Sequence, residues 1–242
     1  LVRQAAVTLL EQAPPEFRQR YAIPLLEDPV RAVRIEAARI LAGLPTDGLG
    51  EKQQQLLDDG LQEFIAAQMA MAERPEARTN LANLYATQGN TAEAIRLYRA
   101  VIELDPAYVP AYANLADLYR SQGKETEAEK VLRRAIEAVP GNAVLHHALG
   151  LSLVRQQRTG EALEELRLAA GQAPEDAHLV YVYAVALQST GKTGEALMVL
   201  QGAHNAHPDN AAILNALVVW HQELGNTDAA RRYAGKLRAV AP

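Results

Sequence analysis

The strongest constraint in this sequence is a proline that recurs at a fixed interval over residues 75–242. Intervals of 34 residues separate Pro106, Pro140, Pro174, Pro208 and Pro242. A fixed period of this length is typical of repeat proteins, in which each unit buries its apolar face only against its neighbours. The sequence therefore predicts five units, at residues 75–108, 109–142, 143–176, 177–210 and 211–242.

Small and large apolar residues recur in phase with these prolines. The eighth position of each unit holds Ala82, Ala116, Gly150, Ala184 and Val218, and the twentieth holds Ala94, Ala128, Ala162, Ala196 and Ala230. Side chains this small allow two helix backbones to approach closely. Larger apolar columns fill the remaining space, as at Leu81 and Leu115. Each unit is therefore predicted to be a pair of antiparallel helices.

A turn is predicted midway through each unit. Four units carry glycine there, at Gly89, Gly123, Gly191 and Gly225, and the third carries Gln157. A left-handed residue commonly ends a helix, so glycine suits this position and glutamine should cost about 1 kcal/mol. Two residues later most units have threonine, as at Thr91, whose hydroxyl is expected to cap the second helix. The proline, which lacks an N–H, then ends that helix.

With these columns the units resemble tetratricopeptide (TPR) repeats. "NLANLYATQGNTAEAIRLYRAVIELDP" and "AYANLADLYRSQGKETEAEKVLRRAIEAVP" are close matches to that family. The resemblance covers residues 75–242 and implies an all-α, right-handed helical-repeat solenoid, the TPR superhelix. It also implies a non-enzymatic protein–protein interaction scaffold that binds a peptide or protein segment in its concave groove.

The residues before the repeats follow another pattern. "VRQAAVTLL" and "VRIEAARIL" align at an offset of 31 residues, which pairs Arg3 with Arg34 and Ala6 with Ala37. Residues 1–45 thus resemble HEAT repeats. That resemblance implies that the arginine of this column pairs with an aspartate of a neighbouring unit, for which Asp28 is the candidate. The alternative is that residues 1–45 form an irregular helical cap. Residues 46–74 are predicted to be a linker and one long helix that caps the first TPR. Met69 and Met71 are expected to be ordinary packing residues in it.

The TPR resemblance also projects a groove. The family's contact positions on the first helix of each unit correspond here to Thr79, Asn80, Asn83, Asn114, Asp117, Arg120, His147, Leu151, Arg155, Tyr181, Val185, Gln188, Asn215 and Val219. The groove is expected to change from polar to apolar along this series. An apolar stripe at the ninth position, formed by Leu151, Val185 and Val219, suggests a partner with apolar side chains, with Tyr181 as an anchor; alternatively, the stripe packs between neighbouring helices.

Asn83 and Asn114 are open to two interpretations. Some TPR proteins hold a terminal carboxylate with two asparagines and several cations. Here Thr79, Val144 and Ala148 occupy the columns that should be cationic, which argues against such a carboxylate clamp. The two asparagines either bind the backbone of an extended peptide or bond to an adjacent helix.

Composition and motifs exclude several other functions. The formal net charge of −5 argues against general affinity for nucleic acid, and no apolar run is long enough for membrane insertion. The chain has no cysteine, which excludes disulfides and haem attachment within it. No catalytic, phosphate-binding or metal-binding motif is present, so neither cofactor nor metal is expected. His204 and His207 are only a weak candidate for a pair of metal ligands. His147 and His178 are both expected to approach the groove.

The wider context of the chain allows alternatives. The sequence starts at Leu1, inside an amphipathic pattern, and is expected to belong to a longer protein. It contains "DPVRAVRIEAARILAGLP", "AERPEARTNLANLYATQGN" and "NAVLHHALGLSLVRQQRTGEALEELRLAA". With these stretches it resembles the C-terminal region of bacterial multihaem cytochrome-type proteins with appended TPRs, which implies a periplasmic parent; otherwise a cytoplasmic location is expected. The alternatives to a binding scaffold are a regulatory or assembly domain of an enzyme, and self-association.

Overall fold

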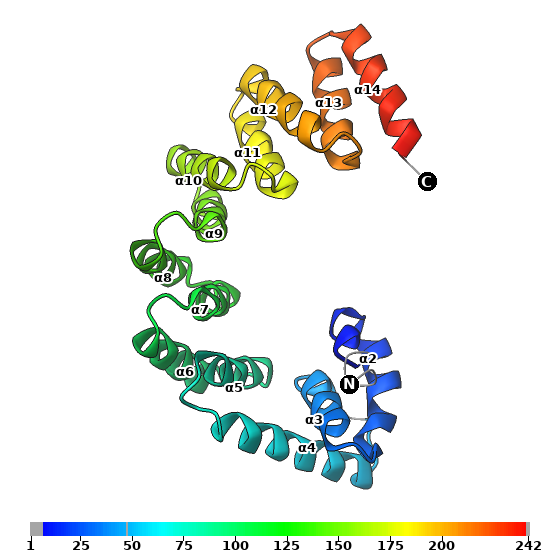
Figure 1. The fold of residues 1–242 in the computed structure, drawn as a ribbon, viewed down its shortest axis with the longest axis vertical. Helices are drawn as coiled ribbons and strands as arrows, with labels where there is room; N and C mark the ends of the chain where they lie inside the picture. The colour runs from blue at the N-terminus through cyan, green and yellow to red at the C-terminus, as the bar shows by residue number, and fades with distance from the viewer. Residues whose placement is uncertain (1–6, 47, 241–242) are drawn as a thin grey trace. The chain divides into compact units, whose positions relative to one another are not determined.

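The structure is a computed structural model that describes residues 7–46 and 48–240. It divides into two compact units, Leu1–Leu118 (unit 1) and Tyr119–Pro242 (unit 2). The boundary lies within helix α7 (Val109–Ser121). Every regular element in the described ranges is helical (Figure 1).

Ten helices repeat at the period that the prolines predict. The first helix of each pair is α5 (Pro75–Thr87), α7, α9 (Ala143–Arg155), α11 (Ala177–Ser189) or α13 (Ala211–Glu223). The second is α6 (Thr91–Leu104), α8 (Glu125–Ala138), α10 (Thr159–Gln172), α12 (Thr193–Ala206) or α14 (Thr227–Val240). Both series advance by 34 residues at every step. The prediction of an all-α helical repeat is confirmed.

The small columns lie where the two helices of a pair meet. Ala82, Ala94, Ala162 and Ala196 are buried, and a Cβ added at Gly150 would lie 2.7 Å from Cγ of Leu166. The prolines behave as expected, since α6 ends two residues before Pro106 and α8 two residues before Pro140. Close packing and helix termination therefore follow from the same columns in each unit.

The turn residue is left-handed in all five pairs. Its φ angle is +78° at Gly89, +72° at Gly123, +80° at Gly191 and +74° at Gly225, and Gln157 adopts +60°. The expectation of threonine caps is wrong, because Thr91, Thr159 and Thr193 are already the first residues of their helices. Among the second helices α6 has a side-chain cap, from Asn90 to the N–H of Glu93 at 3.4 Å, whereas α8, α10 and α12 have none.

Replacing Gln157 by glycine should raise stability. Glutamine at a positive φ is strained by about 1 kcal/mol relative to glycine, so Gln157→Gly should raise the melting temperature by about 2–4 °C. Thermal unfolding followed by circular dichroism measures this. Gln156→Gly is the control in the same turn: it removes a 3.0 Å bond from Gln156 Nε2 to Glu129 and should lower stability. A lower melting temperature for Gln157→Gly would contradict the strain argument.

The N-terminal part of unit 1 is a separate helical cluster. Its elements are η1 (Leu10–Gln12), α2 (Pro15–Ala22), η2 (Ile23–Glu27), α3 (Arg31–Leu41) and α4 (Glu51–Met69). Helices α3 and α4 cross closely, since a Cβ added at Gly60 would lie 2.7 Å from that of Ala38. The core contains Leu26, Val33 and Phe64.

Two expectations for this part change. The long helix ends at Met69, not at residue 74, and α4 packs against α3 and η2 as well as α5. Met69 and Met71 are not packing residues, because they are 64% and 39% exposed. Met69 is the last residue of α4, and Met71 lies in the turn after it.

The HEAT-like pairing is only partly described. Arg3 and Ala6 lie outside the described residues. Arg34 Nη1 donates to the main-chain carbonyl of Asp28 at 2.9 Å, and its Nη2 lies 3.7 Å from Glu63 Oε1. The carboxylate of Asp28 accepts from the N–H of Val30 at 2.8 Å. The arginine therefore reaches the backbone of the predicted aspartate, and the HEAT-like character of residues 1–45 stays a prediction.

Helix α5 is anchored in the N-terminal cluster at two points. Leu84 is buried in the same core as Phe64 and Leu26. Gly43, at a φ of +74°, follows α3 and packs directly on the end of α5: an added Cβ would lie 2.3 Å from the carbonyl oxygen of Thr87. Within unit 1, the N-terminal helices and the first repeated helix are therefore one packed body.

Candidate functional site

The ninth position of the first helices in unit 2 forms a partly exposed apolar stripe. Val185 on α11 and Val219 on α13 are 37% and 39% exposed, and Leu151 on α9 is half-buried. Tyr181, also half-buried, packs against the core that contains Leu187. A binding partner can still bury the exposed apolar surface of these side chains.

Polar side chains flank this stripe. Gln188 Nε2 donates to Glu223 Oε2 at 3.4 Å, which joins the ends of α11 and α13. Arg155 does not extend freely from its helix: its Nε donates to Glu125 Oε1 at 2.7 Å. This bond is the main reason that the pKa of Glu125 lies below its ordinary value. The predicted groove residue Arg155 therefore links α9 to α8.

His147 on α9 and His178 on α11 contact each other. Their ring centroids are 5.4 Å apart, edge to face. Burial, followed by the charge of His178, lowers the pKa of His147, so the neutral ring is favoured at physiological pH. Nowhere in residues 7–46 and 48–240 do three or more potential metal-ligating side chains come together.

In unit 1 the two asparagines bond to neighbouring helices. Asn83 Oδ1 on α5 accepts from Tyr98 O–H on α6 at 2.5 Å and from Asn114 Nδ2 on α7 at 2.9 Å. Burial, aided by the charge of Asp117, raises the pKa of Tyr98 to about 12, so its hydroxyl stays a donor. The adjacent-helix interpretation therefore applies to the carbonyl oxygen of Asn83. Asp117 and Arg120 lie on α7 on either side of the unit boundary.

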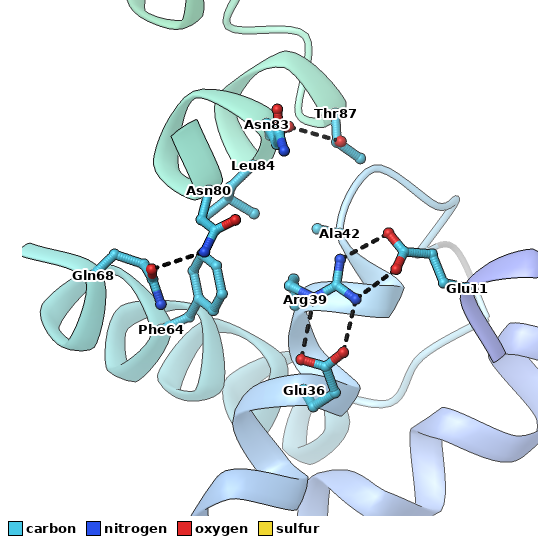
Figure 2. A pocket seen from close by; sticks show the side chains of 10 residues that line it. All are labelled: Glu11, Glu36, Arg39, Ala42, Phe64, Gln68, Asn80, Asn83, Leu84 and Thr87. Carbon is cyan, nitrogen blue, oxygen red and sulfur yellow. Dashed lines mark hydrogen bonds and ion pairs between the residues drawn. The ribbon is translucent and has the colours of Figure 1, made fainter. Parts of the chain in front are cut away.

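A polar pocket of about 470 Å³ adjoins this asparagine within unit 1. Figure 2 shows its lining, which comes from η1, α3, α4 and α5: Glu11, Glu36, Arg39, Ala42, Phe64, Gln68, Asn80, Asn83, Leu84 and Thr87. Two of the projected groove residues, Asn80 and Asn83, therefore line a cavity. Thr79 does not, because it is buried and its Oγ1 donates to the carbonyl of Pro75 at 2.8 Å.

An arginine held by two carboxylates forms one wall of the pocket. Arg39 Nη1 and Nη2 each donate to Glu11 at 2.9 Å, and Nη2 also donates to Glu36 Oε1 at 2.7 Å. The hydrogen bond from Arg39 lowers the pKa of Glu11, and the pKa of Arg39 is raised by the same partners. Sequence reasoning missed this wall. The three-residue spacing of Glu36 and Arg39 signals their pairing but not their place beside α5.

Histidines also pack at the last helix of unit 2. Lys236 Nζ on α14 donates to His204 Nε2 on α12 at 2.7 Å, and His221 stacks on Tyr233 at 5.6 Å. Burial, followed by the charge of Lys236, lowers the pKa of His204 despite opposition from Asp209. Burial and the charge of Arg232 lower the pKa of His221. The bond from Lys236 requires His204 Nε2 to be unprotonated, and the lowered pKa of both histidines favours their neutral forms.

Unfolding should therefore become easier as the pH falls from 7.5 to 5.5. A histidine whose pKa is lower in the folded state binds its proton preferentially in the unfolded state. Its contribution is complete above the ordinary pKa of about 6.5 and is lost below it, whereas carboxylates titrate mainly below about pH 5. Urea unfolding at both pH values measures the loss. Lys236→Met should reduce it, Lys130→Met on exposed α8 surface should not, and equal losses in both variants would contradict the role of Lys236.

Comparison with known proteins identifies the repeats. Two family models described as tetratricopeptide repeat match the chain, over residues 85–151 and 147–211. These ranges overlap and together cover residues 85–211, from the end of α5 to the first residue of α13. The chain is a tetratricopeptide repeat protein. No curated protein matches it significantly in sequence.

Solved structures of other TPR proteins share the fold. A crystal structure of MamA is 20% identical, with a TM-score of 0.56, and the match covers 66% of this TPR protein and 93% of MamA. YrrB, described as a TPR protein with an unusual peptide-binding site, is 23% identical, with a TM-score of 0.55 and coverage of 74% and 92%. PilF of Pseudomonas aeruginosa is 20% identical, with a TM-score of 0.57 and coverage of 69% and 77%.

At these identities the likeness concerns the fold alone. The resemblance to multihaem cytochrome-type proteins stays a prediction. Among the described residues of this TPR protein, no helix combines the length and apolar character needed to cross a bilayer.

Proposed function

We propose that this TPR protein is a protein–protein interaction scaffold that holds an extended partner segment on the first helices of unit 2. The observation that carries the proposal is the exposed apolar stripe on α9, α11 and α13. Val185 and Val219 remain 37% and 39% exposed after the helices have packed. Burying apolar surface is worth about 25 cal/mol per Å², so a partner's apolar side chains can gain from covering this stripe.

Polar groups beside the stripe suit the backbone of such a segment. Asn215 is exposed on α13, and Gln188 keeps a second amide proton beyond its long bond to Glu223. Tyr181 combines apolar area with a hydroxyl at the same face, which is common in residues that dominate binding. That YrrB is described as having a peptide-binding site supports a peptide ligand for the same fold.

The decisive experiment selects ligands from a random 12-residue phage-displayed peptide library. We expect enriched peptides with at least two apolar side chains, and Val185→Asp with Val219→Asp should weaken the best peptide by at least tenfold. Each aspartate would have to be desolvated beside an apolar group. Both positions are exposed enough for the fold to tolerate the change, which circular dichroism checks.

The matched control places the same chemistry on a second helix. Met198 on α12 is 66% exposed, so Met198→Asp changes an exposed apolar side chain to aspartate away from the stripe. It should leave peptide affinity unchanged. No enrichment of peptides, or equal weakening by the control, would overturn the assignment of the stripe as the binding surface.

A further inference from the structure

We propose that the polar pocket of unit 1 is a second binding site, one that takes an arginine or lysine side chain carried on an extended peptide. It lies between the N-terminal helices and α5, encloses about 470 Å³ and is separate from the apolar stripe of unit 2. Its volume falls within the range of about 300–1,000 Å³ that is typical of ligand pockets. The proposal rests on the charge, the amide groups and the rigidity of this cavity.

The charge of the pocket favours a cation. Glu11 and Glu36 contribute two negative charges, and Arg39, which pairs with both, contributes one positive charge. Arg18 also acts on Glu11 but does not line the pocket. Four N–H groups of Arg39 are already bonded to the two carboxylates, so Arg39 has little donor capacity left for a ligand carboxylate or phosphate. The carboxylates retain acceptor capacity, since a carboxylate offers about four lone-pair sites, and Glu11 is still 53% exposed. Each oxygen of Glu11 accepts one bond from Arg39, so a guanidinium or ammonium group can bond to the remaining lone pairs of Glu11.

The amide wall opposite offers both hydrogen-bond donors and acceptors. Asn80 Nδ2 donates to Gln68 Oε1 at 3.1 Å, which directs the Asn80 oxygen and the Gln68 amide protons to other partners (Figure 2). The oxygen of Asn83 accepts two bonds, at 2.5 and 2.9 Å, so its orientation is fixed and its Nδ2 group is a donor. A peptide group presents one N–H and one C=O. This wall can therefore hold the backbone beside the cationic side chain.

The pocket is built from elements that are already packed together. Leu84 and Phe64 belong to one buried core, and Gly43 packs directly on Thr87 at the pocket's edge. The groups that would contact a ligand therefore do not have to be assembled on binding, which lowers its entropic cost. Phe64 and Leu84 also line the pocket, where their apolar atoms can contact the aliphatic stem that lysine and arginine both carry.

The test uses the whole chain and two capped pentapeptides, acetyl-Gly-Ala-Arg-Ala-Gly-amide and its citrulline analogue. Citrulline keeps the shape of arginine but has no charge. We follow the side-chain NH₂ signals of Gln68, Asn80 and Asn83 by NMR during titration. The arginine peptide should shift them saturably, and the citrulline peptide should bind at least fivefold more weakly. Raising sodium chloride from 50 to 300 mM should weaken only the arginine peptide.

Variants separate charge from shape. Glu11→Gln keeps an oxygen that can accept from Arg39 but removes one negative charge, and should weaken the arginine peptide at least threefold without affecting the citrulline peptide. Glu63→Gln is the matched control, because Glu63 pairs with Arg31 at 2.8 Å and does not line the pocket. Gln68→Ala should weaken both peptides.

Three results would overturn the proposal. They are the absence of a saturable shift at the three side-chain amides up to 10 mM peptide, equal affinity for arginine and citrulline, and equal effects of Glu11→Gln and Glu63→Gln. A lysine-for-arginine peptide that binds within threefold would show that charge, not guanidinium geometry, is recognised. The Val185→Asp and Val219→Asp variants of unit 2 leave this pocket intact. Failure of the stripe as a binding surface can therefore be distinguished from failure of the pocket as an arginine site.

Discussion

Gly43→Ala should destabilise unit 1 by about 2–4 kcal/mol. The residue adopts a φ of +74°, which costs an L side chain about 1 kcal/mol, and the added Cβ would lie 2.3 Å from the carbonyl oxygen of Thr87. That oxygen belongs to the backbone of α5, so it cannot rotate away, and overpacking of this kind costs about 1–3 kcal/mol. Urea unfolding followed by circular dichroism measures the change in free energy of unfolding.

Gly89→Ala is the matched control for this effect. Gly89 has nearly the same φ, +78°, but an added Cβ would meet nothing within 4 Å. It should therefore cost only the conformational part, about 1 kcal/mol. If Gly43→Ala and Gly89→Ala lowered the free energy of unfolding equally, the close contact between Gly43 and α5 would not contribute to stability. Weaker arginine-peptide binding by Gly43→Ala would follow if α5 moves away from the pocket.

Ala128→Leu should cost about 1–3 kcal/mol in unit 2. Ala128 lies at the small twentieth position of its pair and is 1% exposed, so three added carbons have no space. Ala138→Leu on the same helix is the control, because Ala138 is exposed and leucine is a good helix former. Thermal unfolding of the two variants should therefore differ by several degrees. Unchanged stability of Ala128→Leu would show that the small column does not mark the helix contact.

Much of the repeat architecture could be predicted from residue columns. Glycine, proline and alanine act through local sterics, which depend little on distant residues, and for that reason the period located every helix pair. The left-handed Gln157 shows that the fold imposes the turn even where the residue type resists it. The threonine caps were predicted wrongly because a threonine at the first helical position cannot be told from one at the cap without the backbone angles.

The candidate sites were predictable only where they follow the same period. The stripe of Leu151, Val185 and Val219 was read from one column, and its exposure agrees with a binding surface, although its role stays a proposal. The pocket was not predicted, because Glu11, Arg39 and Gln68 reach α5 through non-periodic packing of the N-terminal helices. Pairing over such sequence distances depends on how α3 and α4 cross at Gly60, which no local pattern encodes.

The burial of Leu84 in the N-terminal core limits how such an array can lengthen in evolution. A duplicated unit inserted after Pro106 would meet only another unit of its own kind. A unit inserted ahead of α5 would have to take over both contacts with the N-terminal helices. It would need a large apolar side chain at its tenth position, where the first unit has Leu84, and a first helix whose end packs against Gly43. Ser152 and Ala186 occupy the tenth position in the third and fourth units, so copies of these units would leave a cavity there. Growth by duplication is thus more restricted ahead of α5 than after the first unit.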